Sequence, residues 1–266
     1  MIIDGKYVDG SGLAEHTMYD IHMHMIPGVD DGAWNLEVAD SMLLLSSYQG
    51  ISHIIVTPHS YMAFDQHPDR VYENFGLLKK LAEDKYPEIS LHLGCEVRCN
   101  ERSMDKIITN LKEKIYPTMN GTRYVLAEFS TNILWNHMDY CITRLLEAQF
   151  IPIIAHAERY KNIFPEPLEI MGTTEMFAIH WLKDCGCLIQ VNTESLYDEL
   201  DSEIRKNAKN MLRYQMIDFL GTDAHDGGSR PPHVEDILTY LYQNCDKDYI
   251  DKIAYANAAE LLLQDI

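Results

Sequence analysis

Residues 19–24 read YDIHMH and residues 53–57 read HIIVT, two short runs rich in apolar and β-branched residues. Between them lies Leu36–Gln49, a longer segment with the periodicity of a helix. A short apolar strand, a polar turn and a longer helix that leads to the next strand are typical of a parallel βα unit. This unit decides the fold, because the same pattern continues along the chain.

The repeated alternation predicts an α/β protein whose parallel strands are buried on both faces. Seven units in about 245 residues favour a closed, TIM-like (β/α) barrel, and an open doubly wound sheet is the alternative. The predicted strands are Tyr19–His24, His53–Thr57, Ser90–Val97, Tyr124–Phe129, Ile151–His156, Cys187–Asn192 and Ile217–Gly221. The predicted helices are Leu36–Gln49, Pro68–Asp84, Met104–Lys114, His137–Phe150, Glu175–Asp184, Ser202–Tyr214, Pro232–Asn244 and Ile250–Leu263.

Composition limits the domain organisation and the partners. Residues 1–17 are polar and aperiodic, so we expect an N-terminal extension followed by a single barrel domain at residues 18–266. The formal net charge of −19 argues against nucleic acid as a partner. The sequence shows neither an apolar run as long as a membrane span nor the pattern of a secretory signal, so we expect a cytoplasmic protein without membrane insertion. Its six cysteines are then expected to be reduced.

Histidine, aspartate and glutamate residues recur where the predicted strands end. His22 and His24 point to one side of the first strand, because residues two apart on a strand share a face. Asp223 and His225 repeat this spacing after the last strand. All carboxyl ends of a parallel barrel lie on one rim, where such barrels keep their active sites. The candidate metal ligands at this rim are His22, His24, Asp31, His59, Glu96, Glu128, His156, Asp223 and His225.

Five imidazoles and four carboxylates form a ligand set without thiolate, which suits manganese, iron, zinc or magnesium. A single histidine at a strand end is usually a hydrogen-bonded loop residue. A buried carboxylate such as Glu128 is harder to explain in that way, because it costs several kcal/mol unless it meets a cation. Nine ligands are too many for one ion and could serve three if some of them bridge.

Two arginines accompany these candidates. Arg159 follows His156 by three residues, and Arg230 follows His225 by five. A loop arginine is ordinarily solvated or paired at the surface. Two guanidinium groups at a metal rim indicate phosphate binding, because guanidinium can contact a phosphate through two parallel hydrogen bonds.

The motifs H-M-H, D-D-G, T-P-H-S, G-C-E, A-E-F-S, A-H-A-E-R-Y, G-T-D-A-H and S-R-P-P-H occur in the order typical of the polymerase and histidinol phosphatase (PHP) family. The chain resembles, from about Met18 to Leu263, the bacterial manganese-dependent protein-tyrosine phosphatase branch of that family, which is associated with capsule or exopolysaccharide regulation. The resemblance implies a distorted barrel of seven strands that holds three divalent ions, with manganese preferred.

The resemblance also implies how the residues share these ions. One ion would be held by His22, His24, Glu96 and Asp223, a second by Glu96 as a bridge with Glu128 and His156, and the third by Asp31, His59 and His225. Arg159 and Arg230 would contact the phosphate.

The function so implied is a phosphomonoesterase in which a metal-activated hydroxide attacks the phosphotyrosine of a bacterial tyrosine kinase. A small-molecule phosphatase of the histidinol-phosphate type is the main alternative. A non-catalytic metal-binding module and a metal-dependent amidohydrolase or nuclease are further alternatives. None of the cysteines has an arginine six positions later, so the sequence lacks the phosphate loop of cysteine-dependent phosphatases.

Overall fold

The computed structural model describes residues 17–65, 67–163, 177–197 and 202–264, together with two short strands near the N-terminus. These strands, β1 (Ile2–Ile3) and β2 (Lys6–Tyr7), pair in antiparallel orientation. The rest of the predicted extension lies outside the described residues, apart from Thr17.

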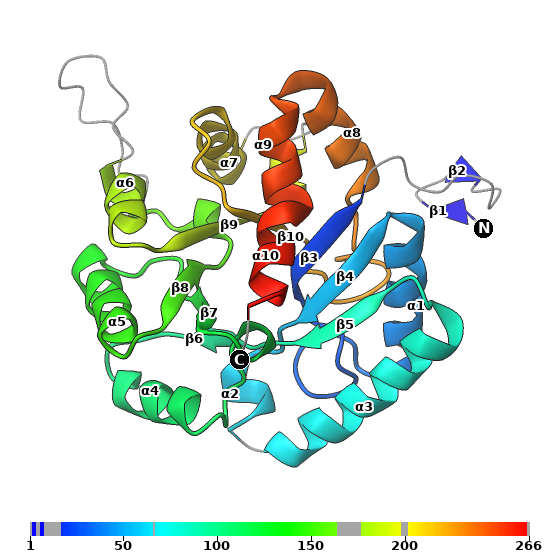
Figure 1. Cartoon of the computed structure of the whole chain (residues 1–266), viewed down its shortest axis with the longest axis horizontal. Helices are drawn as coiled ribbons and strands as arrows, with labels where there is room; N and C mark the ends of the chain where they lie inside the picture. Colours follow the sequence, from blue (N-terminus) through cyan, green and yellow to red (C-terminus); the bar gives the residue numbers. More distant parts are fainter. Residues whose placement is uncertain are drawn as a thin grey trace.

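The centre of the molecule consists of parallel strands in two sheets (Figure 1), as the alternation of strands and helices predicted. One sheet has the order β3-β4-β5 and the other the order β10-β9-β8-β7-β6. The strands are β3 (Met18–Met23), β4 (Ile51–Val56), β5 (Ser90–Leu93), β6 (Glu96–Arg98), β7 (Tyr124–Glu128), β8 (Ile151–Ile154), β9 (Leu188–Asn192) and β10 (Phe219–Gly221).

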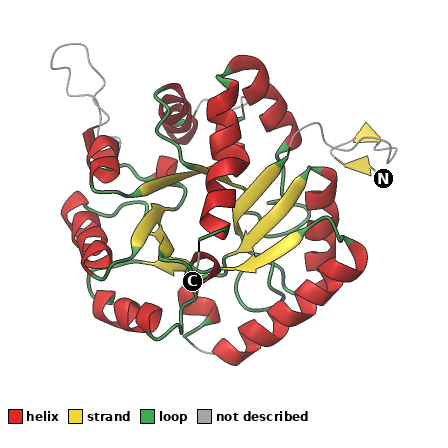
Figure 2. Ribbon diagram, viewed as in Figure 1, coloured by secondary structure: helices red, strands yellow, loops and turns green. Residues whose placement is uncertain are grey.

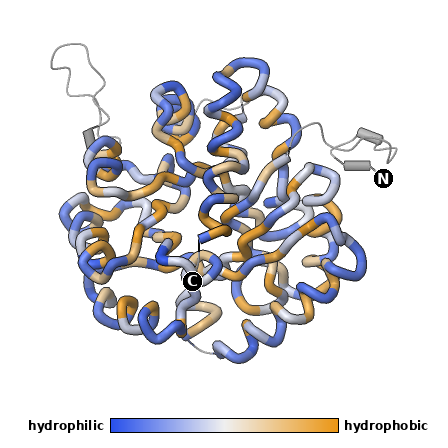
Figure 3. The backbone as a smooth tube through the Cα atoms, viewed as in Figure 1, coloured by the Kyte–Doolittle hydropathy of each residue, from blue (hydrophilic) through white to orange (hydrophobic). Residues whose placement is uncertain are grey.

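Most helices surround the strands on the outside, whereas the last ones cross the middle of the view over the strands (Figure 2). Apolar and polar residues alternate along these helices (Figure 3), so that one side of each packs on the sheets. Asn35 begins the first long helix by accepting a hydrogen bond from the backbone of Val38. The helices are α1 (Leu36–Tyr48), α2 (Ser60–Ala63), α3 (Pro68–Lys85), α4 (Met104–Lys112), α5 (Trp135–Glu147), α6 (Phe177–Asp184), α7 (Glu203–Arg213), α8 (Glu235–Asn244), α9 (Lys247–Asp251) and α10 (Asn257–Leu262).

Two predicted elements differ from the observed ones. The last predicted helix, Ile250–Leu263, contains a π-helical turn at Lys252–Ala256 between α9 and α10. The third predicted strand, Ser90–Val97, is interrupted, so that β5 belongs to one sheet and β6 to the other. The described residues therefore contain eight parallel strands where seven were predicted.

Gly94, at the interruption, lies close against neighbouring side chains. A Cβ atom at this position would lie 2.9 Å from Ile55 Cγ2 and 3.0 Å from Met119 Sδ. Only glycine permits so close an approach, and its backbone N–H donates to the carbonyl of Val56 at 2.9 Å. The chain thus passes from one sheet to the other close against β4.

Hydrogen bonds connect the two sheets at both of their junctions. At one junction the backbone N–H of Asp223 donates to the carbonyl of His22 at 2.7 Å, and that of His24 donates to Ala224 at 2.9 Å. At the other junction the backbone N–H of Glu96 donates to Pro58 at 3.2 Å. These bonds fix the strand ends that carry the candidate ligands against one another.

Apolar side chains from several strands pack together between the sheets, and two of them come from α10. Leu126 belongs to this inner cluster, and Glu128 follows two residues later on the same side of β7. The polar site therefore lies directly above the inner apolar cluster. Among the described helices, none is both long and apolar enough to cross a membrane. The inner cluster consists of Ile21, Ile55, Met119, Leu126, Ile153, Ala155, Phe219, Ala258 and Leu261.

Candidate metal centre

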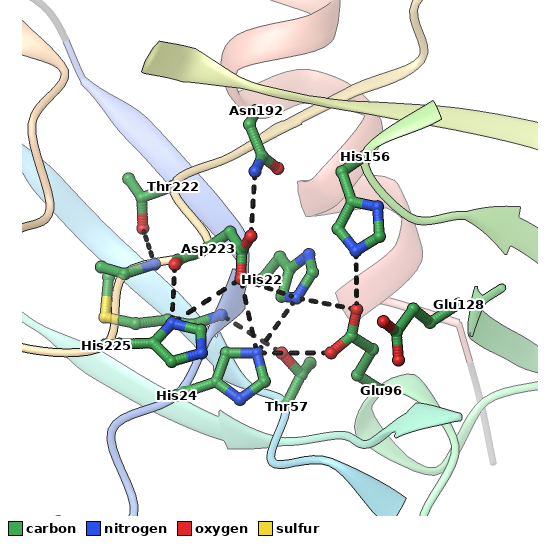
Figure 4. Close-up of polar contacts among 12 residues, drawn as sticks. His22, His24, Thr57, Glu96, Glu128, His156, Asn192, Thr222, Asp223 and His225 are labelled. Carbon is green, nitrogen blue, oxygen red and sulfur yellow. Dashed lines mark hydrogen bonds and ion pairs between the residues drawn. The ribbon is translucent and has the colours of Figure 1, made fainter. Parts of the chain in front are cut away.

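The structure brings the nine candidate ligands together at the carboxyl ends of the strands. Figure 4 shows seven of them, all except Asp31 and His59. Glu96 lies at the centre of the group and is only 1% exposed. One of its oxygens, Oε1, lies 3.0 Å from His156 Nε2 and 3.4 Å from His22 Nε2. The other oxygen, Oε2, lies 3.4 Å from His24 Nε2 and 2.8 Å from His59 Nδ1. Four imidazoles therefore surround a single buried carboxylate.

Asp223 follows β10 in a left-handed backbone conformation, with φ 54°. Its Oδ1 faces the imidazoles, at 3.5 Å from His22 Nε2 and 3.6 Å from His24 Nε2. Its Oδ2 faces the other way, at 3.1 Å from Arg159 and 2.9 Å from Arg230. Asp223 thus joins the imidazole cluster to the two arginines.

Asp31 lies at the more open side of the cluster, with its side chain 52% exposed. Its Oδ1 is 3.4 Å from His59 Nε2 and 3.6 Å from His225 Nε2. The His225 ring stacks on that of His24 with 4.1 Å between ring centres. These contacts continue the cluster from the buried centre to its rim.

Glu128 ends β7 and forms an ion pair with Arg98. Its other oxygen, Oε2, is 3.8 Å from His59 Nδ1. Burial, together with the nearby charge of Glu96, raises the pKa of Glu128 to about 7. Two carboxylates this close in a buried site favour a bound cation, because a cation would let both remain ionised.

Buried polar atoms without a hydrogen bond indicate whether the cluster suits a metal ion. Few buried polar side-chain atoms among the described residues lack a hydrogen bond of normal geometry, and His59 Nδ1, Glu96 Oε2 and Glu128 Oε2 are three of them. The first two lie 2.8 Å apart but do not form such a bond, and a buried polar atom without one costs about 1–3 kcal/mol. These three belong to one group of potential ligand atoms that lie within 4.8 Å of one another. A divalent cation with nitrogen and oxygen ligands fits this donor set.

Two further groups of potential ligand atoms satisfy the same 4.8 Å limit. They differ in part from the division that the family resemblance implied, because His24 joins the group of Asp31 and His59 joins that of Glu128. The atoms of His156 and Asp223 contact the cluster but belong to none of the three groups. The groups are His24 with Asp31, His59 and His225; His22 with His24 and Glu96; and His59 with Glu96 and Glu128.

The pKa shifts of the buried groups show that the cluster favours positive charge. Burial alone would lower the pKa of His22, but Glu96 and Asp223 hold it above the ordinary value. Burial would likewise raise the pKa of Asp223, but His22 and His24 hold it below the ordinary value. The carboxylates thus stabilise positive charge among the imidazoles, either as protons or as metal ions.

Gln190 supports the cluster and was not predicted from the sequence. Its Oε1 accepts a hydrogen bond from His22 Nδ1 at 3.1 Å and another from the backbone N–H of His156 at 2.7 Å. Its Nε2 donates to Asn192 Oδ1 at 2.9 Å, and Asn192 donates to Asp223 Oδ2 at 3.0 Å. Because an amide oxygen can only accept, His22 carries its proton on Nδ1, which leaves Nε2 free to act as a ligand. Two amides in an otherwise apolar strand are the sequence signal that could have revealed this role.

Asp30 is a second supporting residue that the sequence reasoning missed, because it chose the neighbouring Asp31. The buried Asp30 carboxylate lies 2.8 Å from His24 Nδ1 and accepts a hydrogen bond from the backbone N–H of His59 at 3.1 Å. It orients the ring of His24 as Gln190 orients that of His22. The loop needs glycine at Gly32, because a Cβ atom there would lie 2.1 Å from the carbonyl oxygen of His24.

Comparisons with known proteins identify the family of the chain. A family model described as capsular polysaccharide synthesis, CpsB/CapC, matches residues 18–263. The chain is 26% identical over 251 residues to the tyrosine-protein phosphatase CpsB of Streptococcus agalactiae, which covers 92% of this chain and 98% of that protein. It is 30% identical over 215 residues to the putative tyrosine-protein phosphatase CapC of Staphylococcus aureus, which covers 80% and 79%.

A solved structure shows a similar fold. It comes from work on YwqE of Bacillus subtilis and CpsB of Streptococcus pneumoniae, described as unique metal-dependent tyrosine phosphatases. The TM-score is 0.79 at 24% sequence identity, and the match covers 94% of this chain and 96% of the other. At this identity the likeness shows the fold.

Proposed function

The chain belongs to the CpsB/CapC capsular polysaccharide synthesis family, and from this premise we propose that it is a metal-dependent phosphomonoesterase that removes phosphate from phosphotyrosine in a protein. The family membership confirms the resemblance to the tyrosine-phosphatase branch drawn from the sequence motifs. The observation that carries the proposal is the buried cluster around Glu96, with its unsatisfied ligand atoms and two arginines at its edge.

We propose three divalent ions at this cluster, with manganese preferred over iron, zinc or magnesium. Support comes from the number of donors and from the position of Glu96, which contacts residues of all three proposed sets. The ions would lower the pKa of a water molecule towards neutrality and polarise the phosphoryl oxygens. Following the family resemblance, the proposed ligands are His22, His24, Glu96 and Asp223 for one ion, Glu96, Glu128 and His156 for the second, and Asp31, His59 and His225 for the third.

Arg159 and Arg230 are proposed to bind the phosphate. Both contact Asp223 and both remain partly exposed, with 25% and 39% of their side chains accessible. They can therefore donate hydrogen bonds to the non-bridging oxygens of a phosphate at the cluster and stabilise negative charge as it develops. A phenol has a pKa of about 10, so tyrosine leaves with less need for protonation than an aliphatic alcohol.

Family membership leaves open which protein is the substrate and whether the strands close into a barrel, and we propose an answer to both. The names of the relatives support a phosphotyrosine protein as substrate, and we propose a bacterial tyrosine kinase in the cytoplasm, without nucleic acid or membrane insertion. The hydrogen bonds at both sheet junctions support one distorted barrel formed by residues 18–266, which has seven strands if the interrupted β5 and β6 are counted as one. Residues 1–17 would then be an extension.

The test combines metal removal with a panel of phosphate esters. Treatment with EDTA should abolish hydrolysis of a phosphotyrosine peptide, and added manganese should restore it, because the proposed chemistry requires bound cations. Activity that persists after complete metal removal would refute the mechanism. Turnover of histidinol phosphate but not of the peptide would replace the protein substrate with the small-molecule alternative.

A further inference from the structure

A cavity lies towards the amino ends of the strands, whereas the metal cluster lies at their carboxyl ends. It has a volume of about 1150 Å³ and lies between α3, β5 and the segment that leads from α4 to β7. β5 is the last strand of its sheet, and its residues line the hollow. The hollow beside that edge is larger than the roughly 300–1,000 Å³ of ordinary small-molecule pockets.

The wall of this cavity combines polar residues with several large apolar side chains. Ile89 and Leu91 line it and are otherwise buried, at 5% and 7% exposure. Phe75, Leu93 and Phe150 also line it, and each packs on the core while remaining partly exposed. An apolar ligand group that covers these side chains would remove their surface from water, and this would stabilise the complex.

The charged residues around the cavity are mostly basic. Lys79, Lys112, Lys114 and Arg123 line it, against the single acidic residue Glu83. Within the described part of the chain, no carboxylate lies at ion-pair distance from any of the four cations. The whole chain has 41 acidic and 22 basic residues, so four basic residues against one acidic residue reverse the overall charge balance at this cavity.

We infer that this cavity binds a small amphiphilic anion, a molecule with an apolar body and a phosphate, sulfonate or carboxylate group. The apolar wall would cover the body of the ligand. The basic side chains would pair with its charged group, and Coulomb attraction between them is stronger beside an apolar wall than in bulk water. The inference does not depend on the proposed phosphatase activity, because no residue of the metal cluster lines this cavity.

The experiment measures binding of 1-anilinonaphthalene-8-sulfonate, an aromatic sulfonate, by its fluorescence. We expect saturable binding that persists in EDTA, which separates this cavity from the metal cluster. Dodecyl phosphate should displace the probe, whereas inorganic pyrophosphate and decanol should not at equal concentration. Displacement by pyrophosphate alone would overturn the requirement for an apolar body, and displacement by decanol alone would overturn the requirement for charge.

Matched variants locate the binding. Lys79→Glu and Arg123→Glu should each weaken probe affinity by about tenfold, because each reverses a charge that faces the ligand. Lys80→Glu makes the same change at the next residue of α3, which is exposed and does not line the cavity, and should leave affinity unchanged. Ser90→Trp, at the exposed start of β5, should block binding by filling the hollow. Equal losses in Lys79→Glu and Lys80→Glu, or normal binding in Ser90→Trp, would overturn the proposal.

Discussion

The two ends of the parallel strands present opposite environments. At the carboxyl ends, carboxylates and imidazoles are buried together and contact one another within a few ångströms. At the amino ends, basic side chains surround an apolar hollow and have no acidic partners among the described residues. The first arrangement attracts cations and the second attracts anions.

One feature of the backbone contributes to both environments. The strand that is interrupted at Gly94 resumes at Glu96, which begins β6 in the centre of the metal cluster. Because β5 ends before the interruption, its outer edge is left beside the cavity. A single irregularity in a parallel sheet thus places a carboxylate in the buried cluster and leaves the end of a sheet beside the cavity.

The largest effect is expected from Glu96→Gln. The change keeps the size of the side chain but removes the charge that four imidazoles share. Turnover of a phosphotyrosine peptide should fall by about 10³-fold or more, because the proposed bridging ligand is lost. Steady-state kinetics and metal content by elemental analysis provide the measurement. Glu147→Gln, at a 67% exposed position of α5, is the control, and a similar loss there would discredit the assignment.

The next effect is expected from Gln190→Leu. This change leaves the N–H groups of His22 and His156 without their acceptor. Apparent manganese affinity should fall by about 10–100-fold, while the maximal rate at saturating manganese should largely recover. Gln190→Glu keeps an acceptor oxygen and should recover part of the affinity. Unchanged metal affinity in Gln190→Leu would show that the buried amide has no role in positioning the ligands.

The carboxyl ends were largely predictable from the sequence, because histidines and carboxylates at strand ends are chemically distinctive residues at distinctive places. The supporting residues Gln190 and Asp30 were missed, because an amide in a strand and the first aspartate of a pair have many ordinary roles. The amino-end cavity could not be predicted. Lys79 and Arg123 resemble any surface cation in sequence, and only the packing around the interrupted strand brings them to one hollow.

The arginines at the edge of the cluster should give a smaller effect. Arg159→Ala and Arg230→Ala should each lower kcat/KM for the peptide by at least about tenfold, because each removes a donor to the phosphate. Arg144→Ala is the matched control, since this arginine pairs with Asp105 and lies on α5. Metal content should stay normal in all three variants. Normal kinetics in both Arg159→Ala and Arg230→Ala would exclude these residues from phosphate binding.

The smallest effect on turnover is expected from two glycine substitutions, one at the interruption and one away from it, which should instead change the stability of the fold. Gly94→Ala places a methyl group within 3.0 Å of side chains from two other elements, and should lower the free energy of unfolding by about 1–3 kcal/mol. Gly76→Ala, in the middle of α3, has no atom within 4 Å of its new methyl group and should raise it by about 0.5–1 kcal/mol. Denaturant melts of both variants give the measurement. If Gly94→Ala were as stable as Gly76→Ala, the close packing around Gly94 could not be what requires glycine at the interruption.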